Sequence, residues 1–279
     1  MHVTSREDHQ SVFEPVRTHD PDRYLTALMA PRRVRGALMA LYAFNTELAR
    51  IPTLVSEPAL GEIRLQWWRD AVDQMGRVVP PGAPVAAALG QAVAAHDLPI
   101  PLLIGMVDAR SADLDCGGFR DLEALKAYLY KSDGAVFALS AHILGIDDAD
   151  ANRAANAAGF ACGLTNLIRL LARDIAEGRI MLPLSMLDAH GIQLDQILAG
   201  TCSDELKPVL VELVSEARAA RETARQQIAK LDPVARSAFA PLALVESYLN
   251  TLERPDHIAL KHIASINPLS RFWRLWRAS

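Results

Sequence analysis

The sequence predicts an all-α protein, and three observations support this. Apolar residues recur at three- and four-residue intervals over long segments, no segment alternates as a half-buried strand does, and the segments are separated by short turns rich in proline and glycine. The 279 residues are 51% hydrophobic and 22% charged, which is enough for a sizeable buried core. We expect one helical domain over residues 21–279, preceded by a flexible N-terminus over residues 1–20.

Proline residues mark the ends of the helices expected in the first half of the chain. Asp20-Pro21 is typical of an N-cap followed by a first turn, so a short helix is expected over residues 22–30. A longer helix over residues 32–51 carries apolar residues at helical spacing and ends at Pro52. Three more helices are expected: one over residues 58–75, an alanine-rich one that ends at residue 96, and one over residues 99–113.

The second half begins after Gly117-Gly118, the clearest break in the first 120 residues. The patterns there predict a long apolar helix over residues 121–144, a second over 147–177, a charged amphipathic helix over 203–231, another helix over 233–252, and a short aromatic tail from Pro268.

Composition excludes several classes of protein. The net charge of -4 gives no general attraction to nucleic acid, because phosphate binding needs clustered Lys and Arg. The three cysteines lack C-x-x-C spacing, which argues against a zinc site and a disulfide framework. No secretory signal and no apolar stretch long enough to cross a bilayer is present. We therefore expect a cytoplasmic protein, whose contact with a membrane is at most peripheral and at its inner face.

One stretch near the middle of the chain carries a family resemblance. The run Leu164-Thr165-Asn166-x-x-Arg169, followed by Gly178-Arg179 and Leu182-Pro183, resembles the second aspartate-rich helix of the squalene/phytoene synthase family. That family joins two prenyl diphosphates with magnesium held by helix carboxylates. The resemblance extends from about Tyr24 to Trp276 and implies the isoprenoid synthase fold, in which antiparallel helices surround a central cavity.

The chain departs from this family at the metal-binding positions. The two aspartates of the second motif are matched by Leu170 and Asp174, and the acids of the first by Ala49, Arg50 and Thr53. Magnesium is usually held by one or two carboxylates together with phosphate oxygens. Because these carboxylates are replaced, we expect the chain to have lost its magnesium-binding site and the ionisation of a prenyl diphosphate to be very slow. We expect no catalytic residue, no metal site and no cofactor, with Mg²⁺ required only if the chain is an enzyme. Four or more acids reaching the cavity from other positions would contradict this expectation.

A finer resemblance concerns the segment that replaces the first motif. Asn45-x-Glu47-Leu48-Ala49 resembles the degenerate subgroup related to a mitochondrial complex I (NADH dehydrogenase) assembly factor. It implies a non-catalytic assembly or binding factor, with complex I subunits or assembly intermediates as partners. The alternative is an active head-to-head prenyltransferase that condenses prenyl diphosphates.

The resemblance also implies a residual cavity that could hold an isoprenoid or another lipid. The candidate ligand-binding residues are Arg35, Tyr42, Tyr128, Asn166, Arg169, Asp174 and Arg179. Two simpler interpretations remain open: Arg169 and Asp174 form an ion pair, or Arg35 and Arg179 are solvated side chains at helix ends.

The C-terminal tail alternates basic and aromatic residues. Its candidate membrane-contact residues are Arg271, Trp273, Arg274, Trp276 and Arg277. A basic aromatic helix of this kind is typical of segments that lie in a membrane interface. The alternative is a C-terminal helix that packs on the rest of the bundle.

Overall fold

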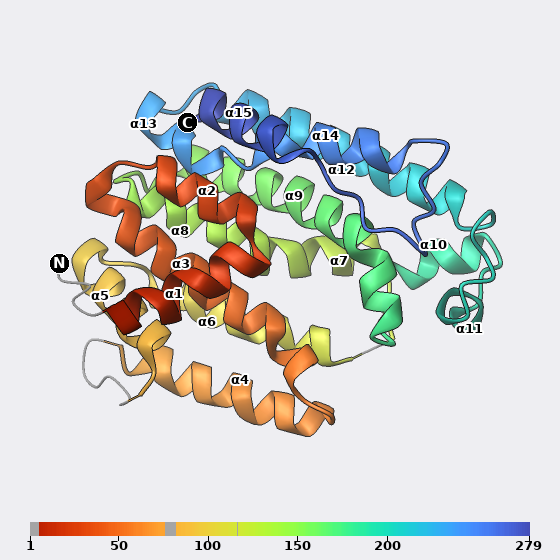
Figure 1. Cartoon of the computed structure of the whole chain (residues 1–279), viewed down its shortest axis with the longest axis horizontal. Coiled ribbons are helices and arrows are strands. Elements are labelled where there is room, and N and C mark those ends of the chain that lie inside the picture. The colour runs from red at the N-terminus through yellow and green to blue at the C-terminus, as the bar shows by residue number, and fades with distance from the viewer. Residues whose placement is uncertain (1–5, 76–81, 116) are drawn as a thin grey trace.

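The computed structural model describes residues 6–75, 82–115 and 117–279, and its elements are helices (Figure 1). Within these residues the extended backbone forms a single isolated bridge, between Phe119 and Pro183. The predicted all-α class is therefore confirmed. Among the described residues, no helix combines the length and the apolarity that crossing a bilayer requires.

The first half of the chain forms helices that follow the predicted pattern closely. They are α1 (Arg6–His19), α2 (Pro21–Met29), α3 (Arg32–Arg50), α4 (Pro58–Asp73), α5 (Pro84–His96) and α6 (Ile100–Ala109). The proline-rich turn expected before α5 includes Pro80 and Pro81, which lie outside the described residues.

The expectation of a flexible N-terminus over residues 1–20 is wrong for residues 6–19, which form α1. Val12 and Val16, one helical turn apart, are buried in the main hydrophobic core. Charged and polar residues elsewhere in α1 conceal this apolar pair when composition alone is considered. Residues 1–5 lie outside the described part of the chain.

The second half contains more breaks than the sequence predicts. Its helices are α7 (Leu122–Leu129), α8 (Ala135–Ile143), α9 (Ala149–Ala176), α10 (Leu184–Ala189), α11 (Leu194–Leu198), α12 (Lys207–Ile228), α13 (Pro233–Arg236), α14 (Leu242–Leu252) and α15 (Pro268–Ala278). The helix expected over residues 121–144 is interrupted by a π-helical turn, η3 (Tyr130–Gly134). The one expected over residues 233–252 is interrupted before α14, whose N-cap is Pro241.

Helices α3 and α9 carry the core of the bundle. In α3 the side chains of Leu38, Leu41, Tyr42 and Phe44 are almost completely buried. Helix α9 lies beside η3 at a point where each of the two segments carries a glycine. A Cβ on Gly159 would overlap the backbone of Gly134. This close approach places one face of α9 and the acidic turn η3 on the same internal cavity.

Candidate functional site

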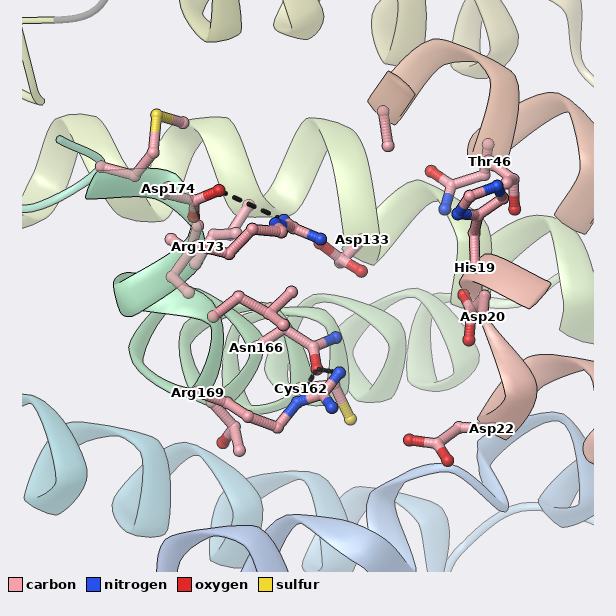
Figure 2. Close-up of a pocket in the computed structure, with 18 of the residues that line it drawn as sticks. His19, Asp20, Asp22, Thr46, Asp133, Cys162, Asn166, Arg169, Arg173 and Asp174 are labelled. Atoms are coloured by element: carbon pink, nitrogen blue, oxygen red, sulfur yellow. Dashed lines mark hydrogen bonds and ion pairs between the residues drawn. The ribbon is translucent and has the colours of Figure 1, made fainter. Parts of the chain in front are cut away.

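A cavity of about 460 Å³ opens between α2, α3, η3, α9 and α14. On α9, the side chains of Cys162, Asn166, Arg169 and Arg173 follow one another at intervals of three or four residues (Figure 2). That spacing places them on one face of the helix, which is the face that lines the cavity. Opposite them lie residues from α2 and α3, including Asp20, Asp22 and Thr46.

The cavity is far more acidic than the family motifs predict. Six carboxylic acids line it: Asp20, Asp22, Asp113, Asp133, Asp174 and Glu177. The first four come from outside the aligned motifs, so the condition stated above is met, and the expectation that the cavity has lost its acids is wrong. The neighbours of these acids decide whether they are available to a metal. Six arginines line the same cavity: Arg23, Arg50, Arg110, Arg169, Arg173 and Arg179.

Arg23 pairs with two acids at once. It is 6% exposed, and its guanidinium donates to Oδ2 of Asp20 at 2.9 Å and to Oδ1 of Asp133 at 2.7 Å. Burial alone would lower the pKa of Arg23, but the two carboxylates raise it above the ordinary value. Asp20 also accepts from the backbone N–H of Arg23, so the N-cap of α2 and the cavity share one carboxylate.

A second buried group joins α3, the segment after α6, and α7. Arg110 donates to Oδ2 of Asp113 at 3.0 Å, to the hydroxyl of Tyr128 at 2.8 Å and to Oδ1 of Asn45 at 3.1 Å. The hydroxyl of Tyr128 in turn donates to Oδ1 of Asp113 at 2.6 Å. Burial raises the pKa of Tyr128 well above its usual value, so this hydroxyl keeps its proton.

The remaining motif acid is held by its own segment. Arg179 donates to Oδ1 of Asp174 at 2.7 Å and to Oε2 of Glu177 at 2.6 Å, and Arg173 donates to Asp174 at 3.2 Å. Burial raises the pKa of Asp174 despite these two arginines. The family aspartate therefore survives as part of an ion-pair cluster at the end of α9.

The sixth acid, Asp22, is paired with side chains of α14 and α15. Tyr248 donates its hydroxyl to Oδ2 of Asp22 at 2.8 Å, and Nε of Arg271 forms an ion pair with Oδ1 of Asp22 at 2.8 Å. Burial, followed by the charge of Asp20, raises the pKa of Asp22.

These pairs do not fit a magnesium cluster. Mg²⁺ needs oxygen ligands that face a common point. Here each of the six acids instead forms an ion pair with an arginine, and Asp22 and Asp113 also accept from a tyrosine hydroxyl. In the described part of the chain, no group of three or more His, Cys, Asp or Glu side chains is arranged to hold a metal ion. A metal would have to displace arginines that are already paired in low-dielectric surroundings.

Most of the predicted ligand-binding residues do lie on this cavity: Tyr128, Asn166, Arg169, Asp174 and Arg179. Arg35 and Tyr42 do not. Arg35 donates to the backbone carbonyl of Ala30 at 3.2 Å, and the hydroxyl of Tyr42 accepts from Ser140 at 3.3 Å inside the core. Both lie on the same face of α3 as Thr46 and Ala49, but nearer the N-terminus of the helix, beyond the residues that line the cavity.

The alternative pairing of Arg169 with Asp174 is also wrong. Arg169 donates to Oδ1 of Asn166 at 3.1 Å, and its guanidinium lies over the ring of Tyr248 at 4.6 Å from the centroid. The prediction missed Arg23, Arg110 and their acidic partners. Asp20 and Asp22 stand at the start of a helix, where acidic residues are common. That local explanation gives no indication that both side chains also line the cavity.

Comparison with known proteins places this geometry in a family. The model of the squalene/phytoene synthase family matches residues 16–273. The chain belongs to this family. It is 30% identical over 275 residues to "NADH dehydrogenase (ubiquinone) complex I, assembly factor 6" of Rattus norvegicus, covering 97% of this chain and 83% of that protein. It is 28% identical over 242 residues to "Phytoene synthase 1, chloroplastic" of Arabidopsis thaliana, covering 83% of this chain and 56% of that protein.

A solved structure supports the architecture. The crystal structure of squalene synthase HpnC from Alicyclobacillus acidocaldarius superimposes with a TM-score of 0.78, covering 94% of this chain and 98% of that one at 23% sequence identity. The predicted isoprenoid synthase fold is confirmed. At this identity the likeness shows the fold alone.

Proposed function

We propose that this member of the squalene/phytoene synthase family is a non-catalytic assembly or binding factor for respiratory complex I. The observation that carries the proposal is the cavity, in which internal arginines pair with the acids that line it, including Asp174, the one acid left at the motif positions. The relatives named complex I assembly factor 6 match nearly the whole chain. The partners would be complex I subunits or assembly intermediates, met at the cytoplasmic side of the membrane.

The chemistry of the family supports this assignment. Departure of diphosphate from a prenyl chain requires strong compensation of the charge that develops on the leaving group, which divalent metals supply. In this cavity Leu170 replaces a metal-binding aspartate, and Asp174 is bound by Arg173 and Arg179. An arginine that is already paired has little charge left to offer a second anion.

The cavity itself is retained, and we propose that it holds an isoprenoid or lipid without converting it. Its wall combines apolar side chains from α9 and α14, such as Leu167 and Leu244, with the half-buried guanidinium of Arg169. Such a wall suits a hydrocarbon chain with an anionic or polar end.

An active prenyltransferase is the second candidate, and the acids at Asp20, Asp22, Asp113 and Asp133 are the observation in its favour. The two candidates differ in a direct measurement. Purified protein is incubated with farnesyl or geranylgeranyl diphosphate and Mg²⁺, and diphosphate release is followed beside an active dehydrosqualene synthase. We expect no release above the rate without protein. Turnover at an ordinary prenyltransferase rate would refute the non-catalytic assignment.

A complementation experiment tests the assembly role. A deletion strain should lose membrane NADH dehydrogenase activity and complex I abundance, and the wild-type gene should restore both. Asp174→Asn is the informative variant, because it removes the motif carboxylate that an enzyme would need for magnesium while keeping the size of the side chain. We expect this variant to restore complex I as well as the wild type does. Unchanged complex I in the deletion strain would refute the assembly role.

A further inference from the structure

The C-terminal segment differs in charge from the rest of the chain. From residue 257 to residue 279 the sequence contains four Lys or Arg residues and no Asp or Glu, whereas the whole chain has a net charge of -4. The four are Lys261, Arg271, Arg274 and Arg277. The second half of this segment is helix α15, which lies along the outside of the bundle beside α14 (Figure 1).

One side of α15 is fixed to the protein. Leu275 is completely buried in a small cluster with Ala240, Leu244 and Tyr248. One turn earlier, Arg271 forms its ion pair with Asp22. The side chain of Asn267 caps the helix by accepting from the backbone N–H of Leu269 at 2.8 Å. The helix is therefore formed and held in place before it meets any other molecule.

The opposite side of α15 is apolar and uncovered. Leu269 is 80% exposed, and Phe272, Trp273 and Trp276 are 51%, 54% and 57% exposed. These four positions are spaced by one, three or four residues and form one stripe along the exposed side of the helix. The rings of Trp273 and Trp276 lie 5.3 Å apart.

Two arginines border this stripe. Arg274 and Arg277 are exposed and form no ion pair in the described structure, and the guanidinium of Arg277 lies 5.9 Å from the ring centroid of Trp273. The exposed stripe thus combines tryptophan, phenylalanine and leucine with unpaired positive charge. This is the composition of helices that lie in the boundary between lipid headgroups and acyl chains.

We propose that the outer side of α15 binds the surface of a bilayer that contains anionic phospholipid. Phe272, Trp273 and Trp276 would enter the headgroup region, and Arg274 and Arg277 would contact lipid phosphates. The charge of the segment favours this occupant, because the membrane surface is negative and no acid of the segment opposes it.

Docking of α15 on the protein strengthens the contact instead of competing with it. An isolated short helix binds lipid weakly, because it must first be ordered. Here Leu275 and Arg271 order the helix and leave its aromatic side outward. The two alternatives for the tail, a docked helix and a membrane contact, therefore concern different sides of one helix and do not exclude each other. The proposal does not depend on the assembly role.

The test is flotation of the purified full-length protein with vesicles, one set of phosphatidylcholine alone and one containing a third phosphatidylglycerol. We expect flotation with the anionic vesicles at low salt and at least tenfold less binding to the neutral set. The variant Phe272→Ser/Trp273→Ser/Trp276→Ser should lose at least tenfold in binding. Its matched control is Leu60→Ser/Ile63→Ser, which removes exposed apolar residues from α4 and should bind as the wild type does.

The arginines are tested by charge reversal. Arg274→Glu/Arg277→Glu should lose binding, whereas Arg17→Glu/Arg153→Glu, which reverses two exposed charges elsewhere, should keep most of it. These substitutions are preferable to a truncation after Ile266, because truncation would also remove the partner of Asp22. Brominated lipid should quench tryptophan emission in the wild type and much less in Trp273→Phe/Trp276→Phe. No flotation of the wild type with anionic vesicles, or equal flotation of the aromatic variant, would overturn the proposal.

Discussion

Replacing Gly159 with alanine tests the close contact on which the site is built. A Cβ at this position would overlap the backbone N and Cα of Gly134 and come within 2.9 Å of the carbonyl carbon of Asp133. Backbone atoms cannot rotate away as a side chain can, so α9 and η3 would have to separate. Because Asp133 accepts from Arg23, this separation would also disturb the ion pair between these two residues.

The expected magnitude follows from two opposing effects. Alanine in a helix interior normally stabilises by about 0.5–1 kcal/mol relative to glycine. Overpacking a filled contact costs about 1–3 kcal/mol, and a clash with backbone lies at the upper end. We therefore expect Gly159→Ala to lower the free energy of unfolding by about 2 kcal/mol.

Gly90 in α5 provides the matched control, because a Cβ there meets nothing within 4 Å. Gly90→Ala should stabilise the protein by about 0.5–1 kcal/mol, which leaves a difference of about 3 kcal/mol between the two variants. Urea unfolding followed by far-UV circular dichroism measures both values. Equal stability of the two variants would refute the inferred contact between α9 and η3.

Three further predictions concern buried charge and the docked helix. Arg23→Met leaves the carboxylates of Asp20 and Asp133 without their shared cation and should cost about 3–5 kcal/mol in thermal unfolding; a loss below about 1 kcal/mol would contradict the ion-pair network. Burial raises the pKa of Glu47, so the folded state binds that proton more tightly than the unfolded state, and the unfavourable contribution of Glu47 to stability at neutral pH is lost as the pH falls through its folded-state pKa. Glu47→Gln should therefore be more stable than the wild type at neutral pH and lose this advantage in acid, as urea unfolding at several pH values would show. Leu275→Ala should cost about 2–5 kcal/mol of docking and accelerate tryptic cleavage within α15; unchanged cleavage would contradict the docked position.

Local signals in the sequence account for much of the fold. Asp20 was predicted to cap α2, and its side chain accepts from the backbone N–H of Arg23 at 3.1 Å. Proline fixes the helix boundaries near residues 31 and 52, because it lacks an N–H and restricts its neighbours. Such effects depend on adjacent residues, and a single sequence displays them.

The features that were missed depend on residues far apart in the chain. The π-helical turn at Tyr130–Gly134 has no local signal, and it forms where Gly134 meets Gly159 of a different helix. The ion pair of Arg23 with Asp133 joins positions that are 110 residues apart. The family motifs predict the position of α9 correctly. They do not indicate which acids of α2 and η3 line the cavity or which arginines pair with these acids.

The balance of charge inside the cavity has a consequence for the protein in the cell. A pocket of bare carboxylates depends on incoming cations to relieve its internal repulsion, and its shape therefore follows the supply of those ions. Here the guanidinium groups are part of the chain itself and arrive when it folds. The charges of the acids in this interior are therefore compensated by the chain itself.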